Sequence, residues 1–474
     1  MFRRHPAVAA ALAAALLSLV TPAVSAAQAP SGAWAGAIAI MGQKLDIVVT
    51  FSGEGSGLKA TIDIPQQGAT GLPLLNLKAE GTKVHFELQA GPGLAVFDGE
   101  RKGDTIAGTF EQSGMKGAFD LAPKTAAQAE PPPPYAVEDV KIPAGTVTLA
   151  GTLTLPPGTG PHPVVVLITG SGAQNRDEEI FGMKPFRLIA DHLTRLGVAV
   201  LRCDDRGVGG STGSMATATT ADFADDTAAM VQFLKARADI DKARIGLLGH
   251  SEGGLVAPLV ASRSKDVAFV VLMSAPAVTG EQILLEQGLL LARASGLPAD
   301  QIARNAELQR KVFAAVRTGQ GWQEVEEQTF AATRESLEKM PEAQRKAIPD
   351  LDGLAKKTAQ QQLAAARSPW FKYFLEYDPA PALSKVTCPV LAIFGEKDLQ
   401  VPVAQNRDPM EAIFRKSGNR RVAFQVVPRA NHLYQDSITG NATEYATLKK
   451  EFVPGFLDLV GKWVKEQVQV KGTQ

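Results

Sequence analysis

Residues 249–253 read Gly-His-Ser-Glu-Gly, and their surroundings make this short run the most informative of the chain. The largely apolar segment 244–248 comes directly before it, and the helix-like segment 254–257 comes directly after it. A strand, a tight turn and a helix in this order expose a serine hydroxyl at the turn, and the first N–H groups of the helix face any oxyanion formed there. The small residues beside Ser251 let neighbouring backbone approach it. The run therefore predicts that Ser251 is a nucleophile.

A second copy of the same pattern, at residues 209–213, lacks these surroundings. Ser211 lies several residues beyond the apolar run 198–201, and no helical pattern begins at it. A match to so short a motif is only a hypothesis until its structural context agrees. We therefore interpret Ser211 as a structural loop residue. The nearby charged residues Asp205 and Arg206 are expected to hold the same loop by hydrogen bonding rather than to take part in catalysis.

The N-terminal residues are typical of a secretory signal peptide. Arg3 and Arg4 form a positively charged start, residues 7–20 are almost wholly apolar, and residues 24–26 offer a small-residue cleavage site. The apolar run is shorter than the about 20 residues that a bilayer-spanning helix needs. We expect residues 1–26 to be removed on export. The mature protein would then be periplasmic or secreted, without a membrane span.

Composition argues against several classes of partner and cofactor. The 49 basic and 49 acidic residues balance, so there is no electrostatic argument for a nucleic acid or an anionic membrane as a partner. No His/Cys/carboxylate cluster has metal-ligand spacing and no phosphate-binding loop motif occurs, so neither a metal nor another cofactor is expected. The two cysteines, Cys203 and Cys388, are placed at opposite ends of parallel strands, beyond the about 7 Å that a disulfide bridge spans, and two free thiols are expected. The oligomeric state stays open.

The chain after the signal segment divides into three parts. Residues 31–122 carry short alternating segments separated by glycines, which indicates a small antiparallel β domain. Residues 123–134 form a Pro-rich linker. From 135 to 470, apolar strands alternate with helices, the pattern of an α/β sheet covered on both faces. Within that part, about 276–388 has helical spacing and no convincing strand, so we expect a helical cap over the strand ends.

A nucleophilic serine needs a base, and the six histidines leave one good candidate. The four that precede residue 200 lie in the signal segment, in the β domain, before the first core strand and in a helical run. His250 adjoins Ser251, and its side chain is expected to point away from the serine. His432 remains, in the loop after the predicted strand 422–427, and it is the predicted base.

The base in turn needs an orienting acid, expected after a strand and between the other two residues in sequence. Asp398 follows the strong strand 390–394. Glu396 is the rival in the same loop. The order Ser251, Asp398, His432 is the one that α/β sheets with a strand–turn–helix nucleophile use.

Residues 136–470 resemble α/β-hydrolase-fold serine hydrolases, particularly bacterial esterases and serine-aminopeptidase-like members. The resemblance implies an α/β-hydrolase sheet with a cap insertion, and it implies that Ser251 is the nucleophile, His432 the base and Asp398 its acid. The matching stretches are Gly-His-Ser-Glu-Gly-Gly at 249–254, Cys-Asp-Asp-Arg-Gly-Val-Gly-Gly-Ser at 203–211, Ser-Pro-Trp-Phe at 368–371 and Gly-Glu-Lys-Asp at 395–398.

The resemblance also implies an oxyanion hole made of two backbone N–H groups. The N–H of Glu252 is the first. The second comes from the loop 169–172, where many relatives have His-Gly and this chain has Thr-Gly. This departure leaves Ser171 and Gly172 as alternatives, and Ser171 is preferred.

The favoured function is hydrolysis of carboxylic esters through an acyl-enzyme intermediate, with a small ester or a short peptide as substrate. A serine aminopeptidase stays open, because the cap carries acids that can bind a substrate ammonium, namely Glu324, Glu326 and Glu327. The alternative of another class is a non-catalytic binding protein on the same scaffold. Such proteins usually lose a triad member, whereas this sequence offers all three. The role of the N-terminal β domain stays open: binding of a surface or glycan and packing against the cap are the alternatives.

Overall fold

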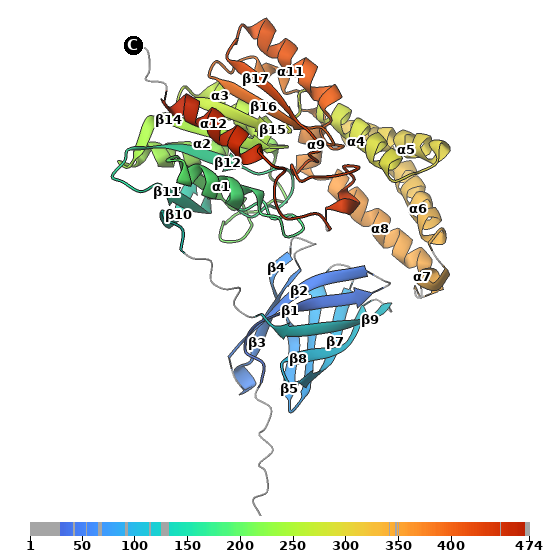
Figure 1. The fold of residues 1–474 in the computed structure, drawn as a ribbon. Coiled ribbons are helices and arrows are strands. Elements are labelled where there is room, and N and C mark those ends of the chain that lie inside the picture. Colours follow the sequence, from blue (N-terminus) through green and yellow to red (C-terminus); the bar gives the residue numbers. More distant parts are fainter. Residues whose placement is uncertain are drawn as a thin grey trace, which may run out of the picture.

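The computed structural model of the chain describes residues 29–40, 43–53, 55–64, 69–90, 93–112, 115–124, 132–340, 342–346, 348, 350–445 and 447–469 (Figure 1). The predicted signal peptide at 1–26 and most of the predicted linker at 123–134 lie outside these residues. Among the helices that are described, none is both long enough and apolar enough to cross a membrane.

The N-terminal domain is an antiparallel sheet whose strands run in the order β4-β3-β2-β1-β9-β8-β7-β6-β5. Alternate side chains of these strands point inward and form a core of their own, in which the rings of Phe86 and Phe97 stack with centroids 4.6 Å apart. The strands are β1 (Gly32–Ile40), β2 (Gln43–Ser52), β3 (Lys59–Ile64), β4 (Ala69–Pro73), β5 (Leu75–Glu80), β6 (Lys83–Ala90), β7 (Gly93–Lys102), β8 (Thr105–Gln112) and β9 (Met115–Pro123).

The second sheet runs in the order β10-β11-β13-β12-β14-β15-β16-β17. Its first strands pair antiparallel, and every pair from β13 to β17 is parallel. The strands are β10 (Ala136–Ala144), β11 (Val147–Leu155), β12 (His162–Ile168), β13 (Ala199–Cys203), β14 (Ile240–His250), β15 (Phe269–Met273), β16 (Val390–Gly395) and β17 (Val422–Val427). Strands β13, β15 and β16 are buried along their whole length, so they read as largely apolar runs in the sequence, whereas the edge strand β17 is mostly half-buried or exposed.

Helices cover both faces of this sheet and form two separate apolar cores. One face packs against α2 (Thr220–Ala236), α3 (Gly253–Arg263), α10 (Ala380–Leu383) and α11 (Val403–Ser417), and the other packs against α1 (Pro185–Arg195) and α12 (Phe456–Gln469). Cys203 is buried at the end of β13, Cys388 is half-buried just before β16, and both thiols are free.

Between β15 and β16 the chain leaves the sheet as a run of helices (Figure 1). They are α4 (Gly280–Ala294), α5 (Ala299–Thr318), α6 (Trp322–Glu338), α7 (Glu342–Lys346), α8 (Leu351–Ala366) and α9 (Pro369–Glu376), followed by α10. A small apolar core that includes Phe313, Val316 and Leu375 joins α4, α5, α6, α8 and α9. The predicted fold class is confirmed: an α/β sheet with a helical insertion follows a small antiparallel β domain.

Candidate active site

Ser251 occupies the turn between the end of β14 and the start of α3. Its φ is +52°, in the left-handed region that residues other than glycine rarely adopt. Such a conformation costs about 1–3 kcal/mol and persists only where the surroundings hold it. Here the N–H of Ser251 donates to the carbonyl of Met273 at 2.9 Å, which ties the turn to the end of the neighbouring strand β15.

The glycines of the motif allow this turn because no side chain fits at their positions. A Cβ on Gly249 would overlap the carbonyl oxygen of Gly253, and a Cβ on Gly253 would overlap the carbonyl oxygen of Ile168 at the end of β12. A Cβ on Gly254 would collide with the side chain of Ala275. The spacing of the glycines in the sequence therefore reflects three positions around the serine where neighbouring atoms lie too close for any side chain.

His432 and Asp398 lie together, although 34 positions separate them in the chain. The Nδ1 atom of His432 is 2.8 Å from Oδ2 of Asp398, and both residues are buried, with 5% and 3% of their surface exposed. The other carboxylate oxygen, Oδ1, accepts hydrogen bonds from the backbone N–H groups of Gln400 (2.8 Å) and Val401 (2.9 Å). Burial alone would raise the pKa of Asp398, but the facing His432 and the N–H of Val401 hold that pKa below its usual range.

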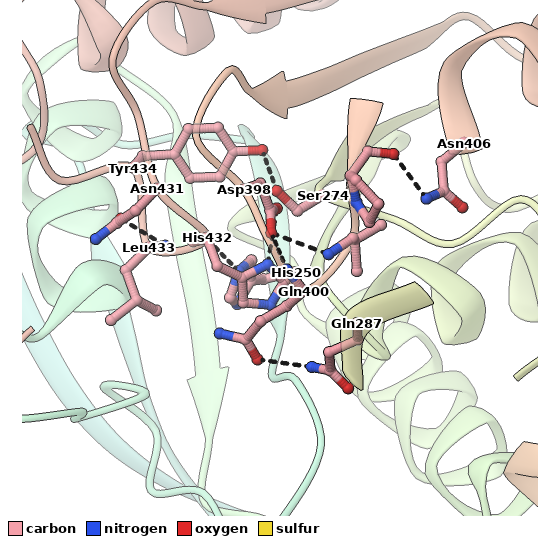
Figure 2. A network of polar contacts seen from close by, with 12 residues as sticks. His250, Ser274, Gln287, Asp398, Gln400, Asn406, Asn431, His432, Leu433 and Tyr434 are labelled. Atoms are coloured by element: carbon pink, nitrogen blue, oxygen red, sulfur yellow. Dashed lines mark hydrogen bonds and ion pairs between the residues drawn. The ribbon is translucent and has the colours of Figure 1, made fainter. Parts of the chain in front are cut away.

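Glu396, the rival acid, lies elsewhere in the same loop. One of its carboxylate oxygens accepts a hydrogen bond from the backbone N–H of Arg429 at 2.7 Å. The acid beside the His432 ring is Asp398. Figure 2 shows Asp398 close to the ring of His432, with Ser274 and Tyr434 next to it; the hydroxyls of Ser274 and Tyr434 are 2.9 Å apart.

Ser251 and His432 line one cavity of about 350 Å³. Its walls come from the loop after β12, from the cap helices α4 and α9, and from the loops that follow β16 and β17. The apolar lining residues are Ile180, Phe181, Pro276, Ile283, Leu284, Trp370, Phe374, Val401, Leu433 and Ala442. A cavity of this size with mostly apolar walls fits a small apolar substrate group.

The loop that was predicted to supply the second oxyanion donor borders this cavity. Gly170 and Ser171 line it, whereas Gly172 is not part of its lining. The N–H of Gly170 donates to Oε1 of Glu178 at 2.6 Å, so this N–H already has a partner. The assignment of Ser171 as the donor stays a prediction.

Asp205 was expected to hold its own loop, but its side chain instead holds the loop after β12. Its carboxylate accepts a hydrogen bond from the hydroxyl of Thr169 (2.7 Å) and one from the N–H of Gln174 (2.9 Å). Burial raises the pKa of Asp205 to about 7. Arg206 does not pair with Asp205; it bonds to Asp226 of α2 at 2.8 Å.

Ser211 takes part in the same network around the turn of residues 204–211. It is buried, with 9% of its surface exposed, its hydroxyl donates to the carbonyl of Asp204, and it accepts from the N–H of Ala150, both at 2.8 Å. These contacts give Ser211 a structural role, and it does not line the cavity.

Glu252 follows the serine, and its side chain joins the turn to the cap. The carboxylate accepts hydrogen bonds from the hydroxyl of Thr220 (2.6 Å) and from the indole N–H of Trp370 (2.9 Å to Oε1). Burial raises the pKa of Glu252. Trp370 belongs to the Ser-Pro-Trp-Phe stretch, in which Ser368 caps the start of α9. Two motifs that the sequence showed separately therefore meet at the cavity.

Sequence reasoning missed two residues of the site, Glu178 and His250. His250 was set aside because it adjoins Ser251, but its ring packs against that of His432 with centroids 4.7 Å apart (Figure 2). Glu178 bonds to His250 from the segment between β12 and α1. It lies in a polar stretch without periodicity, so no signal in the sequence singled it out.

The three acids of the cap that were candidates for binding an ammonium group do not line the cavity. Glu324 forms an ion pair with Lys311 (2.9 Å), and Glu326 pairs with Arg367 (2.5 Å). Glu327 is hydrogen-bonded to Gln323. Among the described residues, no group of three or more His, Cys, Asp or Glu side chains is arranged to hold a metal ion.

Comparisons with known proteins identify a matching family and a similar esterase. A family model described as "Alpha/beta hydrolase family" matches residues 165–446. Esterase EstD of Thermotoga maritima is 28% identical over 393 residues, which are 82% of this chain and 81% of EstD.

Two solved structures to which this chain is similar are an esterase of Pyrococcus furiosus and a proline iminopeptidase of Mycobacterium smegmatis. The esterase has a TM-score of 0.42 and 20% identity, over 70% of this chain and 91% of its own. The iminopeptidase has a TM-score of 0.41 and 18% identity, over 70% of this chain and 98% of its own.

Proposed function

The chain belongs to the alpha/beta hydrolase family, whose model matches more than half of its length, and on that premise we propose that it hydrolyses carboxylic esters through an acyl-enzyme intermediate. The observation that carries this proposal is a single cavity lined by Ser251, on a turn with φ +52°, and by His432, whose ring is bonded to Asp398. The similarity to the esterase EstD, which covers about four-fifths of both chains, supports an ester as substrate.

In the proposed mechanism, the hydroxyl oxygen of Ser251 attacks the ester carbonyl carbon while Nε2 of His432 takes the hydroxyl proton. Asp398 accepts the Nδ1–H of His432, which fixes the tautomer in which Nε2 is free to act as the base. The N–H groups of Glu252 and Ser171 stabilise the oxyanion. The protonated His432 then gives its proton to the departing alcohol, and the same residues activate water to hydrolyse the acyl-enzyme.

The surroundings of the cavity favour an ester over an aminoacyl substrate. An aminopeptidase needs a carboxylate that is free to bind the substrate ammonium. Glu178 is the only acid among the described residues that line the cavity. Its Oε1 is bonded to His250 and to the N–H of Gly170, while its Oε2 is buried without a hydrogen-bond partner. The three acids of the cap have partners outside the cavity. The non-catalytic alternative is disfavoured because Ser251, His432 and Asp398 are all present.

The proposal is tested by measuring turnover of short-chain p-nitrophenyl esters and of aminoacyl p-nitroanilides with one preparation. We expect kcat/KM for the best ester to exceed that for any anilide at least about tenfold, or about 1.4 kcal/mol in transition-state free energy. Ser251→Ala should lower kcat by up to about 10⁶-fold, whereas Ser211→Ala, which lies outside the cavity, should keep most activity. Anilide turnover that exceeds ester turnover and disappears in Ser251→Ala would establish a peptidase instead.

A further inference from the structure

Glu178 and His250 form a buried pair beside the candidate base. They have 1% and 3% of their surface exposed and are 72 positions apart in the chain. His250 is the last residue of β14, and Glu178 lies in the long segment between β12 and α1. The proposed mechanism gives neither of them a chemical step. A buried ionisable pair is costly unless its hydrogen bonds are satisfied, so its place in the site needs a reason.

The contacts of His250 determine how many protons its ring carries. Its Nδ1 atom lies 2.9 Å from Oε1 of Glu178, and its Nε2 atom lies 2.9 Å from the carbonyl oxygen of His432. A carbonyl oxygen and a carboxylate oxygen are both acceptors, so each ring nitrogen must donate. A ring that donates from both nitrogens is an imidazolium cation.

The charges around His250 agree with this assignment. Burial alone would lower the pKa of His250, but the Glu178 carboxylate and the carbonyl of His432 raise that pKa above its usual value. The negative charge of Asp398, on the far side of His432, acts in the same direction. The titratable ring of His432 also packs against His250.

Glu178 extends the pair to the loop after β12. The same oxygen that faces His250, Oε1, also accepts the N–H of Gly170 at 2.6 Å. Glu178 itself has a φ of +51°, a conformation that a residue with a side chain adopts only when its contacts hold it there. The contacts thus run without a break from Gly170, through Glu178 and His250, to the backbone of His432.

We propose that Glu178 and His250 are positioning residues, a buried carboxylate–imidazolium pair that fixes the loop of Gly170 and Ser171 and the loop of His432 on either side of Ser251. The effect on turnover rests on the proposed function, whereas the charge of the pair does not. A displacement of reacting groups by about 1 Å can lower a rate by about 10²-fold. A rigid link between the two loops therefore keeps turnover fast, because it prevents such a displacement.

The charge of His250 is tested by NMR of protein labelled with ¹⁵N-histidine, without substrate. Near pH 8.5 an exposed histidine with a pKa of about 6.5 is neutral, whereas His250 should still show two ring N–H protons. Replacing the other five histidines one at a time assigns the signal. In Glu178→Gln, the side-chain amide can donate to Nδ1, so His250 should become neutral. A neutral His250 in the unaltered protein would overturn the ion pair.

The positioning role is tested by steady-state kinetics on Glu178→Gln and His250→Gln. We expect kcat to fall about 10- to 100-fold while KM stays within about threefold, because the cavity walls remain and only the reacting groups move. Glu179→Gln is the matched control: Glu179 is the next residue, forms an ion pair with Lys184 at 3.2 Å and does not line the cavity.

The outcomes separate the two claims. A charged His250 together with unchanged kcat in both folded variants would overturn the positioning role. If the kinetic variants fail to fold, the NMR measurement on the unaltered protein still determines the charge, and Glu178→Asp, which keeps the carboxylate but shortens its reach, replaces them in the kinetic test. If the unaltered protein hydrolyses no ester, the proposed function fails while the NMR result for the pair stands.

Discussion

Replacing Asp398 by asparagine gives the sharpest test of the catalytic assignment, because the structure determines how the new side chain must lie. Oδ1 of Asp398 accepts the N–H groups of Gln400 and Val401, and Oδ2 faces Nδ1 of His432. The amide oxygen of asparagine can replace only one of these two oxygens. If its NH₂ group faced the two backbone donors, three donors would meet without an acceptor, which is costly in a buried site.

The amide oxygen therefore takes the place of Oδ1, and the NH₂ group faces His432. A donor at that position requires Nδ1 to be the acceptor, so the proton of the neutral ring moves to Nε2. The nitrogen that should receive the serine proton is then already protonated. A tautomer error of this kind lowers kcat by about 10⁴-fold in serine proteases, which corresponds to about 5.4 kcal/mol of transition-state stabilisation.

The assay is ester turnover by Asp398→Asn at saturating substrate, with thermal unfolding measured on the same sample. We expect a loss in kcat of about 10³- to 10⁴-fold with a folded protein. Glu396→Gln, which alters the rival acid of the same loop, should remain close to the unaltered enzyme. The reasoning is refuted if Asp398→Asn keeps kcat within about tenfold of the unaltered enzyme, or if Glu396→Gln loses as much activity.

Two further predictions concern stability and export. Burial raises the pKa of Asp205 to about 7 in the folded protein, above the about 3.9 of an unfolded chain, so between these values the folded state alone holds the proton and stability falls as pH rises. In Asp205→Asn this dependence is absent, so the Tm of the unaltered protein relative to the variant should fall as pH rises from about 4 to about 7 and level off above that. A constant difference would contradict the burial argument. We also propose export: expressed with its own N-terminus in a Gram-negative host, the protein should be recovered from the periplasm beginning at Ala27, and an intact N-terminus in the cytoplasm would rule out the signal peptide.

The strand–turn–helix around Ser251 could be predicted from the sequence because its causes are local. Three glycines within six residues permit backbone contacts that no other residue allows, and the apolar runs on either side are long enough to identify a buried strand and a helix. His432 could be predicted as the base by elimination, because the chain has only six histidines. The helical insertion was visible because helical spacing and the lack of strands persist over a hundred residues.

The choice between Asp398 and Glu396 needed the tertiary structure. Both residues follow β16 within one short loop, and the sequence favours Asp398 only by its position. The backbone N–H groups of Gln400 and Val401 donate to Oδ1 of Asp398, which leaves its other oxygen facing His432. Glu396 instead accepts a hydrogen bond from the backbone N–H of Arg429. Asp398 and Glu396 are only two residues apart in a loop, and loops lack the periodic hydrophobic pattern from which the direction of a side chain can be predicted.

The sequence by itself determined the class of sheet and the predicted nucleophile and base, because each follows from residue type, local backbone geometry or chain order. Only the tertiary structure decided which side chains surround them. Glu178 meets His250 across 72 positions, and Trp370 meets Glu252 across 118. Contacts of this kind depend on how long loops and the cap fold back over the carboxyl ends of the strands, and that path is selected by the packing of the whole domain rather than by any segment of it.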